Sequence, residues 1–491
     1  MRPVARSSLL TGSNIIRGRF VFTVKGVGTS DEKPKARYVA QGHLDKAKPF
    51  MVHNLATLRQ RSTRLLVSTS AVLRFRLFSH DINQAYLQSR DTLARTLYLD
   101  PRPEDRHLFD LTDDEILLLV RPLYGVCDAG DYWFVTLQRH VRDDLLMTPL
   151  SSDPALYMRK GVYGLVGLMG TFVDDCLLGG TDEFQTATKT TLRVFEAKPR
   201  QMDEMEFVDV QVKTSRSLPR TFTLDQTAYV ASLTLLRTGA SYERFTSVRA
   251  AVAWVGHTRP DLGCAINKAA QVSKATYEPR HVHALNKAIW AAQASPSLAL
   301  HYPPLDRTTL QLRAYADASF STNDDQSSKL GYIILLLDGR GRAHVLSFSS
   351  RKSRRVVRSV MAGEVYAFGA AFDEAYMLRH DLERLYDCHI PLTILTDSKQ
   401  LFDVVTRGSH STEKRLLIDV AAAREAYNRR EISNVGLVTS DNNIADSLTK
   451  VKPSGALELL LATGVDRTPV EQWVIRPGTA SPCPTTEIPG V

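Results

Sequence analysis

The segment "LMGTFVDDCLLGG", residues 168–180, sets two adjacent acids, Asp174 and Asp175, between two apolar runs. Strand-like apolar runs on both sides of a polar apex predict a β-hairpin with buried strands and the acids at its tip. Two carboxylates held this close repel each other unless a cation offsets their charge. A structural turn is the alternative, because adjacent aspartates also occur at 113–114, 143–144 and 324–325 in polar surroundings. The apolar flanks favour a metal site.

A chain of 491 residues is too long for one hydrophobic core, which predicts two to four domains. Its composition, 43% hydrophobic and 23% charged residues, is typical of a soluble globular protein. No apolar run approaches the ~20 residues of a membrane span, and the first 30 residues lack the apolar centre of a signal peptide. The five scattered cysteines argue against a zinc site or a disulfide framework and for a reducing compartment. The net charge of +9 fits a polyanionic partner such as nucleic acid without requiring one.

The first half of the chain is predicted to bring a third acid towards the hairpin. "RFVFTVK" and "KARYVAQGH" predict two strands, with Lys35 and Arg37 on the second, and "STRLLVSTSAVLR" predicts a helix. "FRLFSHDINQAYLQS" predicts a short strand that ends at Asp81, followed by a turn or helix that carries Tyr86. Helical stretches follow in "VRPLYGVCDAGDYWFVTLQRHV", "SVRAAVAWVGHTRPDLGCAINKAAQVS" and "RHVHALNKAIWAAQA".

A proline-rich segment, "SPSLALHYPPLDR", predicts a boundary near residue 305, after which a second α/β unit begins. Four acids stand there at strand ends or helix starts, namely Asp317, Glu364, Asp397 and Asp446. Such positions converge at one edge of a sheet in α/β folds, and carboxylates gathered there suit Mg²⁺. Two such ions can activate a water and stabilise the leaving oxygen of a phosphodiester. Each acid alone has a helix cap or a surface charge as its alternative explanation.

A series of motifs runs in one order through residues 17–452: "KARYVAQGH", "STRLLVS", "HDINQAYLQS", "PLYGVCDAGDYW", "FVDD", "TRPDLGCAINKAAQVS", "AYADAS", "KLGYI", "SFSSRKS", "GEVYA", "TDSKQLFDVV", "STEKRLLIDV" and "NIADSLTK". In this order they resemble the reverse transcriptase and ribonuclease H of copia-type retrotransposons. The resemblance implies an α/β (α+β) fold with four parts. These are right-hand polymerase fingers and palm (17–235), a thumb or connection region (236–308), a ribonuclease H-like mixed-sheet domain (309–452) and a C-terminal tail (453–491).

The resemblance also implies roles for individual residues. Asp81, Asp174 and Asp175 match the three polymerase carboxylates, and the four acids of the second half match the ribonuclease H site. Tyr86 matches the aromatic that bars a ribose 2′-hydroxyl. Arg37 matches a finger residue that grips the triphosphate, and Lys35 matches one less closely. An exposed strand face is the alternative for both residues, and for Lys35 it is an equal one. Phe172 replaces a tyrosine, and Asp128 replaces glutamine or another polar residue, which leaves nucleotide contacts from that loop unassigned.

A basic run, "RKSRRVVR", precedes the helix of Glu364. It is either a phosphate-contact patch for a hybrid backbone or a solvated strand end, and its candidate contacts are Arg351, Lys352, Arg354 and Arg355. The resemblance implies Mg²⁺, two ions per site, with Mn²⁺ as a substitute. The implied partners are an RNA template, a DNA primer, an RNA/DNA hybrid and deoxynucleoside triphosphates, with no membrane.

The predicted function is RNA-directed DNA polymerisation with ribonuclease H activity. A catalytically silent nucleic-acid-binding relic and ribonuclease H activity alone are the alternatives. Family polyproteins carry capsid, protease and integrase regions upstream, for which this chain has no room. The implied location is intracellular, either in the cytoplasm, within a virus-like particle if the parent element is intact, or in the nucleus.

Overall fold

The computed structural model describes residues 1–25, 32–51, 55–199, 201–216, 220–408, 413–452 and 454–474. The chain divides into two compact units. The first comprises Met1–Arg59 and Phe78–Gln201, and the second comprises Gln60–Leu77 and Met202–Val491. Among the described residues, no helix combines the length and the apolar character needed to cross a lipid bilayer. The boundaries expected at residues 235, 308 and 452 stay predictions.

One sheet of the first unit contains the two predicted N-terminal strands. Its strand order is β1 (Arg2–Ala5), β6 (Glu115–Leu118), β5 (Tyr98–Asp100), β2 (Ile15–Lys25) and β3 (Lys33–Ala40). In the antiparallel β2–β3 ribbon, Arg37 lies opposite Val21 and Lys35 opposite Thr23. Because side chains alternate between the faces of a strand, Lys35 and Arg37 share one face of the ribbon.

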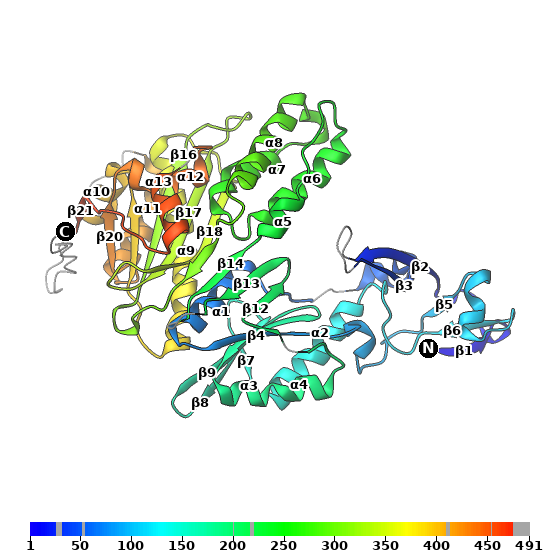
Figure 1. Cartoon of the computed structure of the whole chain (residues 1–491). Helices are drawn as coiled ribbons and strands as arrows, with labels where there is room; N and C mark the ends of the chain where they lie inside the picture. Colours follow the sequence, from blue (N-terminus) through cyan, green and yellow to red (C-terminus); the bar gives the residue numbers. More distant parts are fainter. Residues whose placement is uncertain are drawn as a thin grey trace. The chain divides into compact units, whose positions relative to one another are not determined.

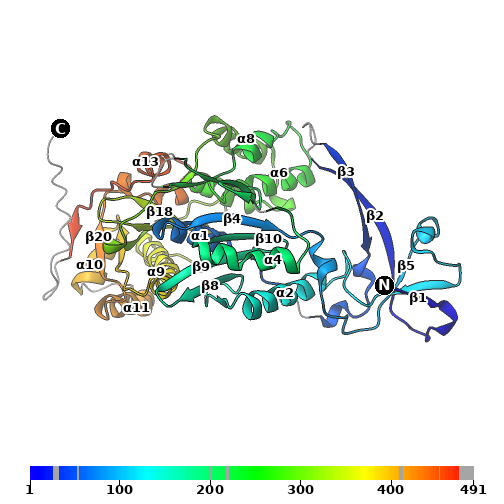
Figure 2. The same cartoon turned by 60° about the horizontal axis from the view of Figure 1, so that its bottom comes forward.

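The second sheet of this unit contains the predicted hairpin (Figure 2), with strand order β11 (Gln201–Met202), β4 (Arg76–Asp81), β10 (Asp175–Gly180), β9 (Gly164–Phe172), β8 (Leu156–Gly161) and β7 (Thr148–Pro149). β9 and β10 pair antiparallel, with Phe172 opposite Asp175, and most of their residues are buried. The prediction of a hairpin with buried strands is therefore confirmed.

Small residues let a helix lie directly on this hairpin. Gly167 and Gly180 are cross-strand partners, and a Cβ atom on either would come within 2.3 Å of the Phe184 ring. Phe184 belongs to α3 (Asp182–Ala187), whose N-terminus is capped by the Thr181 side chain. Gly167 and Gly180 thus make room for the helix that packs against the strands. α2 (Ala129–Arg139) and α4 (Lys189–Val194) belong to the same unit.

The second unit includes a sheet of order β12 (Glu204–Phe207), β13 (Val210–Thr214), β14 (Phe222–Asp225) and β15 (Leu300–Tyr302), and the helices α5 (Thr227–Ser232), α6 (Tyr242–Val255), α7 (Gly263–Ala270) and α8 (Pro279–Ala294). The stretch 247–273, predicted as helical throughout, is interrupted between α6 and α7. Pro260 lacks a backbone N–H, and the residue before it, Arg259, has φ −120° and ψ 75°, outside the helical region.

The fourth sheet has strand order β18 (Ala343–Lys352), β17 (Lys329–Leu337), β16 (Gln311–Ser319), β19 (Leu392–Thr396), β20 (Asn434–Leu437) and β21 (Gln472–Trp473). β18, β17 and β16 are antiparallel, whereas β16, β19 and β20 are parallel, so the sheet is mixed. The long helix α9 (Val360–Tyr386) packs on β16 and β17 (Figure 1). The sheet with its covering helix agrees with the predicted second α/β unit, and the predicted fold class is confirmed.

α10 (Lys399–Arg407), which follows β19, had no counterpart in the sequence prediction. α11 (Leu417–Asn428) and α12 (Asp446–Thr449) lie within "TEKRLLIDVAAAREAYNRR" and "NIADSLTK", which the sequence predicts to be helical. The segment assigned to a tail forms α13 (Gly455–Thr463) and the edge strand β21. α1 (Gln60–Val72) is the helix predicted from "STRLLVSTSAVLR", and it packs against β18 of this unit. Its buried Arg64 donates hydrogen bonds to the backbone oxygens of Leu346 (2.9 Å) and His257 (3.0 Å).

Candidate active sites

The three acids of the first unit come together through the pairing of β4 with β10. Asp81 is the last residue of β4, Asp175 is the first residue of β10, and Asp174 lies in the turn before it. The backbone nitrogen of Ile82 donates to the oxygen of Asp174 over 2.9 Å. Burial raises the pKa of Asp174, and the negative charge of Asp81 adds to the shift. Lys198 contacts the Asp81 carboxylate, so a cation already balances part of this charge.

The turn that carries Asp174 has an unusual backbone. Val173 has φ +56°, in the left-handed region. A β-branched side chain rarely adopts this conformation, because its Cβ substituents crowd the backbone. Strain of this kind costs on the order of 1–3 kcal/mol and persists only where surrounding contacts hold it. The turn therefore depends on contacts from the rest of the unit.

Two of the three predicted nucleotide-binding residues meet around a tyrosine that the sequence did not single out. The Tyr86 ring centroid lies 5.2 Å from that of Tyr124, and the Arg37 guanidinium carbon lies 5.5 Å from the Tyr124 centroid. Burial raises the pKa of both tyrosines, and the charge of Asp174 contributes to each shift. Tyr124 thus lies between Arg37 and Tyr86, near the acids. Its place in "PLYG" was the only signal available. Lys35 shares the Arg37 face, and its role stays a prediction.

The loop residue Asp128 takes part in an ion network. Arg95 Nη1 lies 2.6 Å from Asp128 Oδ2, and Arg95 Nη2 lies 2.6 Å from Asp45 Oδ2. The Asp45 side chain is fully buried, and it also accepts a hydrogen bond from Asn14 over 2.7 Å. In this chain the Asp128 carboxylate therefore fixes the loop through Arg95.

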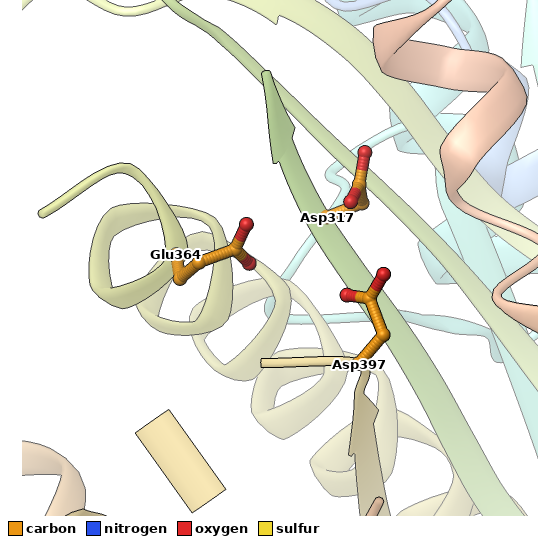
Figure 3. Close-up of side chains that lie close together, drawn as sticks. All are labelled: Asp317, Glu364 and Asp397. Atoms are coloured by element: carbon orange, nitrogen blue, oxygen red, sulfur yellow. The ribbon is translucent and has the colours of Figure 1, made fainter. Parts of the chain in front are cut away.

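In the second unit, three of the four predicted acids converge (Figure 3). Asp317 lies on β16, Glu364 in α9, and Asp397 just after β19. One carboxylate oxygen from each lies within 4.8 Å of the others. Burial, followed by the charges of its neighbours, raises the pKa of Glu364 to about 9, and burial raises that of Asp317 to about 7. Glu364 Oε2 is buried and has no hydrogen-bond partner among the described residues, which suits a cation ligand.

Asp446 lies outside this group of three. It begins α12, and its carboxylate contacts Lys450, which directly follows that helix. Its negative charge nevertheless contributes to the raised pKa of Asp317. Thr449, also on α12, donates a hydrogen bond to Asp317, so α12 reaches the cluster through a hydroxyl group.

The predicted basic patch is partly ion-paired within the chain. Arg355 Nη1 lies 2.9 Å from Asp419 Oδ1, and its guanidinium lies 5.0 Å from the Tyr366 ring centroid. Lys352, the last residue of β18, contacts Asp325. Arg351 and Arg354 are exposed. The patch therefore keeps exposed positive charge, and its role as a phosphate contact stays a prediction.

Residues 8–233 match the family described as reverse transcriptase (RNA-dependent DNA polymerase). The transposon Ty1-ER2 and Ty1-MR2 Gag-Pol polyproteins of Saccharomyces cerevisiae are each 23% identical over 502 residues, covering 91% of this chain and 27% of the polyprotein. The chain thus spans about a quarter of the length of the curated relatives it matches.

Two solved structures are also similar. A foamy viral protease-reverse transcriptase in complex with double-stranded DNA has a TM-score of 0.49 at 11% identity, covering 80% of this chain and 61% of that chain. Ribonuclease H1 of Halobacterium salinarum NRC-1 has a TM-score of 0.23 at 18% identity, covering 28% of this chain and 93% of that chain. With residues 8–233 matching the reverse transcriptase family and with Gag-Pol polyprotein relatives that align along 91% of its length, the chain is similar to a fragment of a copia-type retrotransposon Pol that includes the reverse transcriptase.

Proposed function

We propose that the chain is an RNA-directed DNA polymerase that also cleaves the RNA strand of RNA/DNA hybrids. The observation that carries the proposal is the presence of two separate carboxylate groups at strand ends. One is built by Asp81, Asp174 and Asp175, and the other by Asp317, Glu364 and Asp397. Both sets of ligands are oxygen atoms, which Mg²⁺ prefers and Mn²⁺ also accepts.

In the polymerase site, Asp81, Asp174 and Asp175 would hold the ions. Bound Mg²⁺ would stabilise the charge that develops during phosphoryl transfer. Arg37 supplies a planar guanidinium for the triphosphate of the incoming deoxynucleotide. Tyr86 and Tyr124 supply aromatic surface for its sugar and base, beside Asp174. Lys35, on the same ribbon face as Arg37, is proposed as a second triphosphate contact.

In the ribonuclease H site, Asp317, Glu364, Asp397 and Asp446 would hold the ions. Burial is the main cause of the raised pKa values of Glu364 and Asp317, and the charge of Asp397 adds repulsion to both. A divalent cation removes this repulsion and keeps all the carboxylates ionised. Arg351, Lys352, Arg354 and Arg355 are proposed to contact phosphates of the hybrid.

The proposed partners are an RNA template, a DNA primer, the resulting hybrid and deoxynucleoside triphosphates. We propose an intracellular location, in the cytoplasm or in a particle formed by the parent element, with the nucleus as a second compartment. The family resemblance supports both statements.

The test is primer extension on an RNA template with the purified chain, Mg²⁺ and deoxynucleotides, together with cleavage of a labelled RNA/DNA hybrid. We expect both activities. Cleavage without extension would favour ribonuclease H activity alone. Hybrid binding without either reaction would favour the silent relic.

A further inference from the structure

The strained turn of the acid hairpin is held by a tryptophan from α2. Trp133 is 1% exposed, and its indole nitrogen Nε1 donates a hydrogen bond to the backbone oxygen of Val173 over 2.6 Å. Forty residues separate the two. The indole ring also packs edge-on against Phe195, with 5.2 Å between ring centroids. The helix thus contacts the turn with a directional bond and the neighbouring segment with a ring.

The accepted oxygen belongs to the peptide unit that links Val173 to Asp174. Because a peptide unit is planar, a bond to its oxygen restrains ψ of Val173 and φ of Asp174 together. These two angles set the direction in which the Asp174 side chain leaves the backbone. The bond is partly buried and its donor side chain is buried, so water competes less for it than at the surface, and leaving the indole N–H without an acceptor would be costly.

The Phe195 contact restrains the other acid of the site. The next residue, Glu196, accepts a hydrogen bond from the backbone nitrogen of Asn83 over 2.8 Å, and Lys198 donates its backbone N–H to the oxygen of Asp81, also over 2.8 Å. The segment that carries Phe195 therefore pairs with the end of β4. Trp133 lies between this segment and the Val173 turn.

We propose that Trp133 is a positioning residue of the polymerase site, which fixes the spacing between Asp81 and the Asp174–Asp175 pair through the Val173 carbonyl. The proposal rests on the proposed polymerase function. It adds a residue to which the predicted site assigned no role. A partner that orients the ligands of a metal typically contributes a 10- to 100-fold effect on metal affinity or activity.

The variant is Trp133→Phe, which keeps an aromatic ring near Phe195, removes the N–H donor and makes the ring smaller, so its melting temperature is recorded alongside. We expect primer extension to lose roughly 10- to 100-fold in kcat, with KM for deoxynucleotide within about 3-fold of the parent. The Mg²⁺ concentration for half-maximal extension should rise, and hybrid cleavage should be unchanged. The matched control is Trp254→Phe, because the buried Nε1 of Trp254 has no hydrogen-bond partner among the described residues.

A second readout does not depend on turnover. In the Asp397→Asn chain, which weakens the other acid cluster, Mn²⁺ binding is followed by electron paramagnetic resonance. Trp133→Phe should weaken Mn²⁺ binding about 10-fold. The effect of Trp133→Phe on Mn²⁺ affinity should be smaller in a Val173→Gly background. Glycine adopts a positive φ without strain, so the turn then depends less on the bond from Trp133.

These measurements separate the two ideas. If the parent fails to extend primers while Trp133→Phe still weakens Mn²⁺ binding, the proposed function fails and the positioning role stands. If Trp133→Phe leaves Mn²⁺ affinity and the Mg²⁺ dependence at parental values, the positioning role is overturned. It is also overturned if the effects of Trp133→Phe and Val173→Gly are additive, because the bond would then have no connection with the strained turn.

Discussion

The Nδ1 atom of His344 lies 2.8 Å from the hydroxyl oxygen of Ser68, although 276 residues separate them along the chain. His344 Nε2 lies 2.6 Å from the backbone oxygen of Pro303. A carbonyl only accepts, so Nε2 carries a proton. Burial lowers the pKa of His344 from 6.5 to about 4, so at neutral pH the imidazole is neutral and Nδ1 accepts from the serine. This pair joins α1 to β18 within the second unit.

The neutral His344 predicts acid sensitivity. Between pH 6.5 and pH 4 the unfolded chain binds a proton at this residue and the folded chain does not, so stability is lost as the pH falls through this window. A shift from 6.5 to about 4 corresponds to about 3 kcal/mol. The melting temperature should fall from pH 7.5 to pH 5. His344→Gln should be less stable at pH 7.5 and should show a shallower fall. His283→Gln, at an exposed position, should keep the parental slope, and equal slopes in all three proteins would contradict the assignment.

The acid cluster of Asp317, Glu364 and Asp397 predicts a conflict between stability and metal binding. Without divalent cation, Asp397→Asn should raise the melting temperature and add about 1–2 kcal/mol of stability, because it removes a negative charge that helps to raise the pKa values of Asp317 and Glu364. With Mg²⁺, the parent should gain stability and Asp397→Asn should gain much less. Thermal unfolding with EDTA and with Mg²⁺ measures both effects. An Asp397→Asn chain stabilised by Mg²⁺ as strongly as the parent would show that this cluster is not the metal site.

The two carboxylate groups should be separable by substitution. Asp174→Asn or Asp175→Asn should abolish primer extension and leave hybrid cleavage largely intact, whereas Asp397→Asn should do the reverse. The reason is that each group supplies its own oxygen ligands. Extension within a few fold of the parent in either hairpin variant would contradict the palm assignment. Equal loss of both activities in one variant would indicate misfolding or a shared site.

Tyr86 is predicted to act as a steric gate. Tyr86→Ala should raise the ratio of ribonucleotide to deoxynucleotide incorporation, because the clash with a 2′-hydroxyl is removed. If Tyr86 has a purely structural role, its truncation should instead lower the free energy of unfolding by roughly 3–5 kcal/mol and lower the incorporation of both nucleotides together. The ratio is measured in a folded variant alongside its melting temperature. An unchanged ratio would exclude the gate.

Tyr124 is predicted to support nucleotide binding through its ring. Tyr124→Ala should weaken binding of the deoxynucleotide about 5- to 10-fold, since Arg37 loses a cation–π contact worth about 1 kcal/mol. Tyr124→Phe keeps the ring and should bind nucleotide nearly as the parent does. The measurement is the dissociation constant from single-turnover extension. If the Ala and Phe variants weaken binding equally, the hydroxyl rather than the ring is the feature that matters.

The residues after 452 are predicted to be part of the ribonuclease H fold. Asp466 is buried and lies 2.8 Å from both Arg313 Nη1 and the Tyr315 hydroxyl. Asp466→Ala should lower the free energy of unfolding by roughly 3–5 kcal/mol, because it leaves the Arg313 charge buried and unpaired. The control is Glu425→Ala, which removes an exposed pair with Arg429 and should cost less than about 1 kcal/mol. Denaturant unfolding of both variants gives the comparison.

Local pattern alone determined the secondary structure around the acids. Two apolar runs around "VDD" predicted the β9–β10 hairpin. The strand ends and helix starts after residue 305 predicted one sheet edge for Asp317, Glu364, Asp397 and Asp446, of which the first three converge. These features depend on residues close in sequence, through the period of hydrophobic residues and through turn-forming positions. The apolar face of α1 likewise predicted a helix.

Tertiary structure decided which distant groups meet. The spacing of apolar residues in α1 indicates that one face of the helix is buried. It does not indicate that β18 covers this face, or that Ser68 forms a hydrogen bond with His344. In the sequence, Trp133 is like any other core aromatic residue, and only the folded chain brings its N–H to the Val173 oxygen. In the same way, Tyr124 is like any other loop tyrosine in the sequence, and only the folded chain places Arg37 and Tyr86 beside it. Asp466 has no local signal at all. Each contact joins residues tens to hundreds of positions apart, and the packing of the folded chain, not the pattern of neighbours in sequence, determines such pairs.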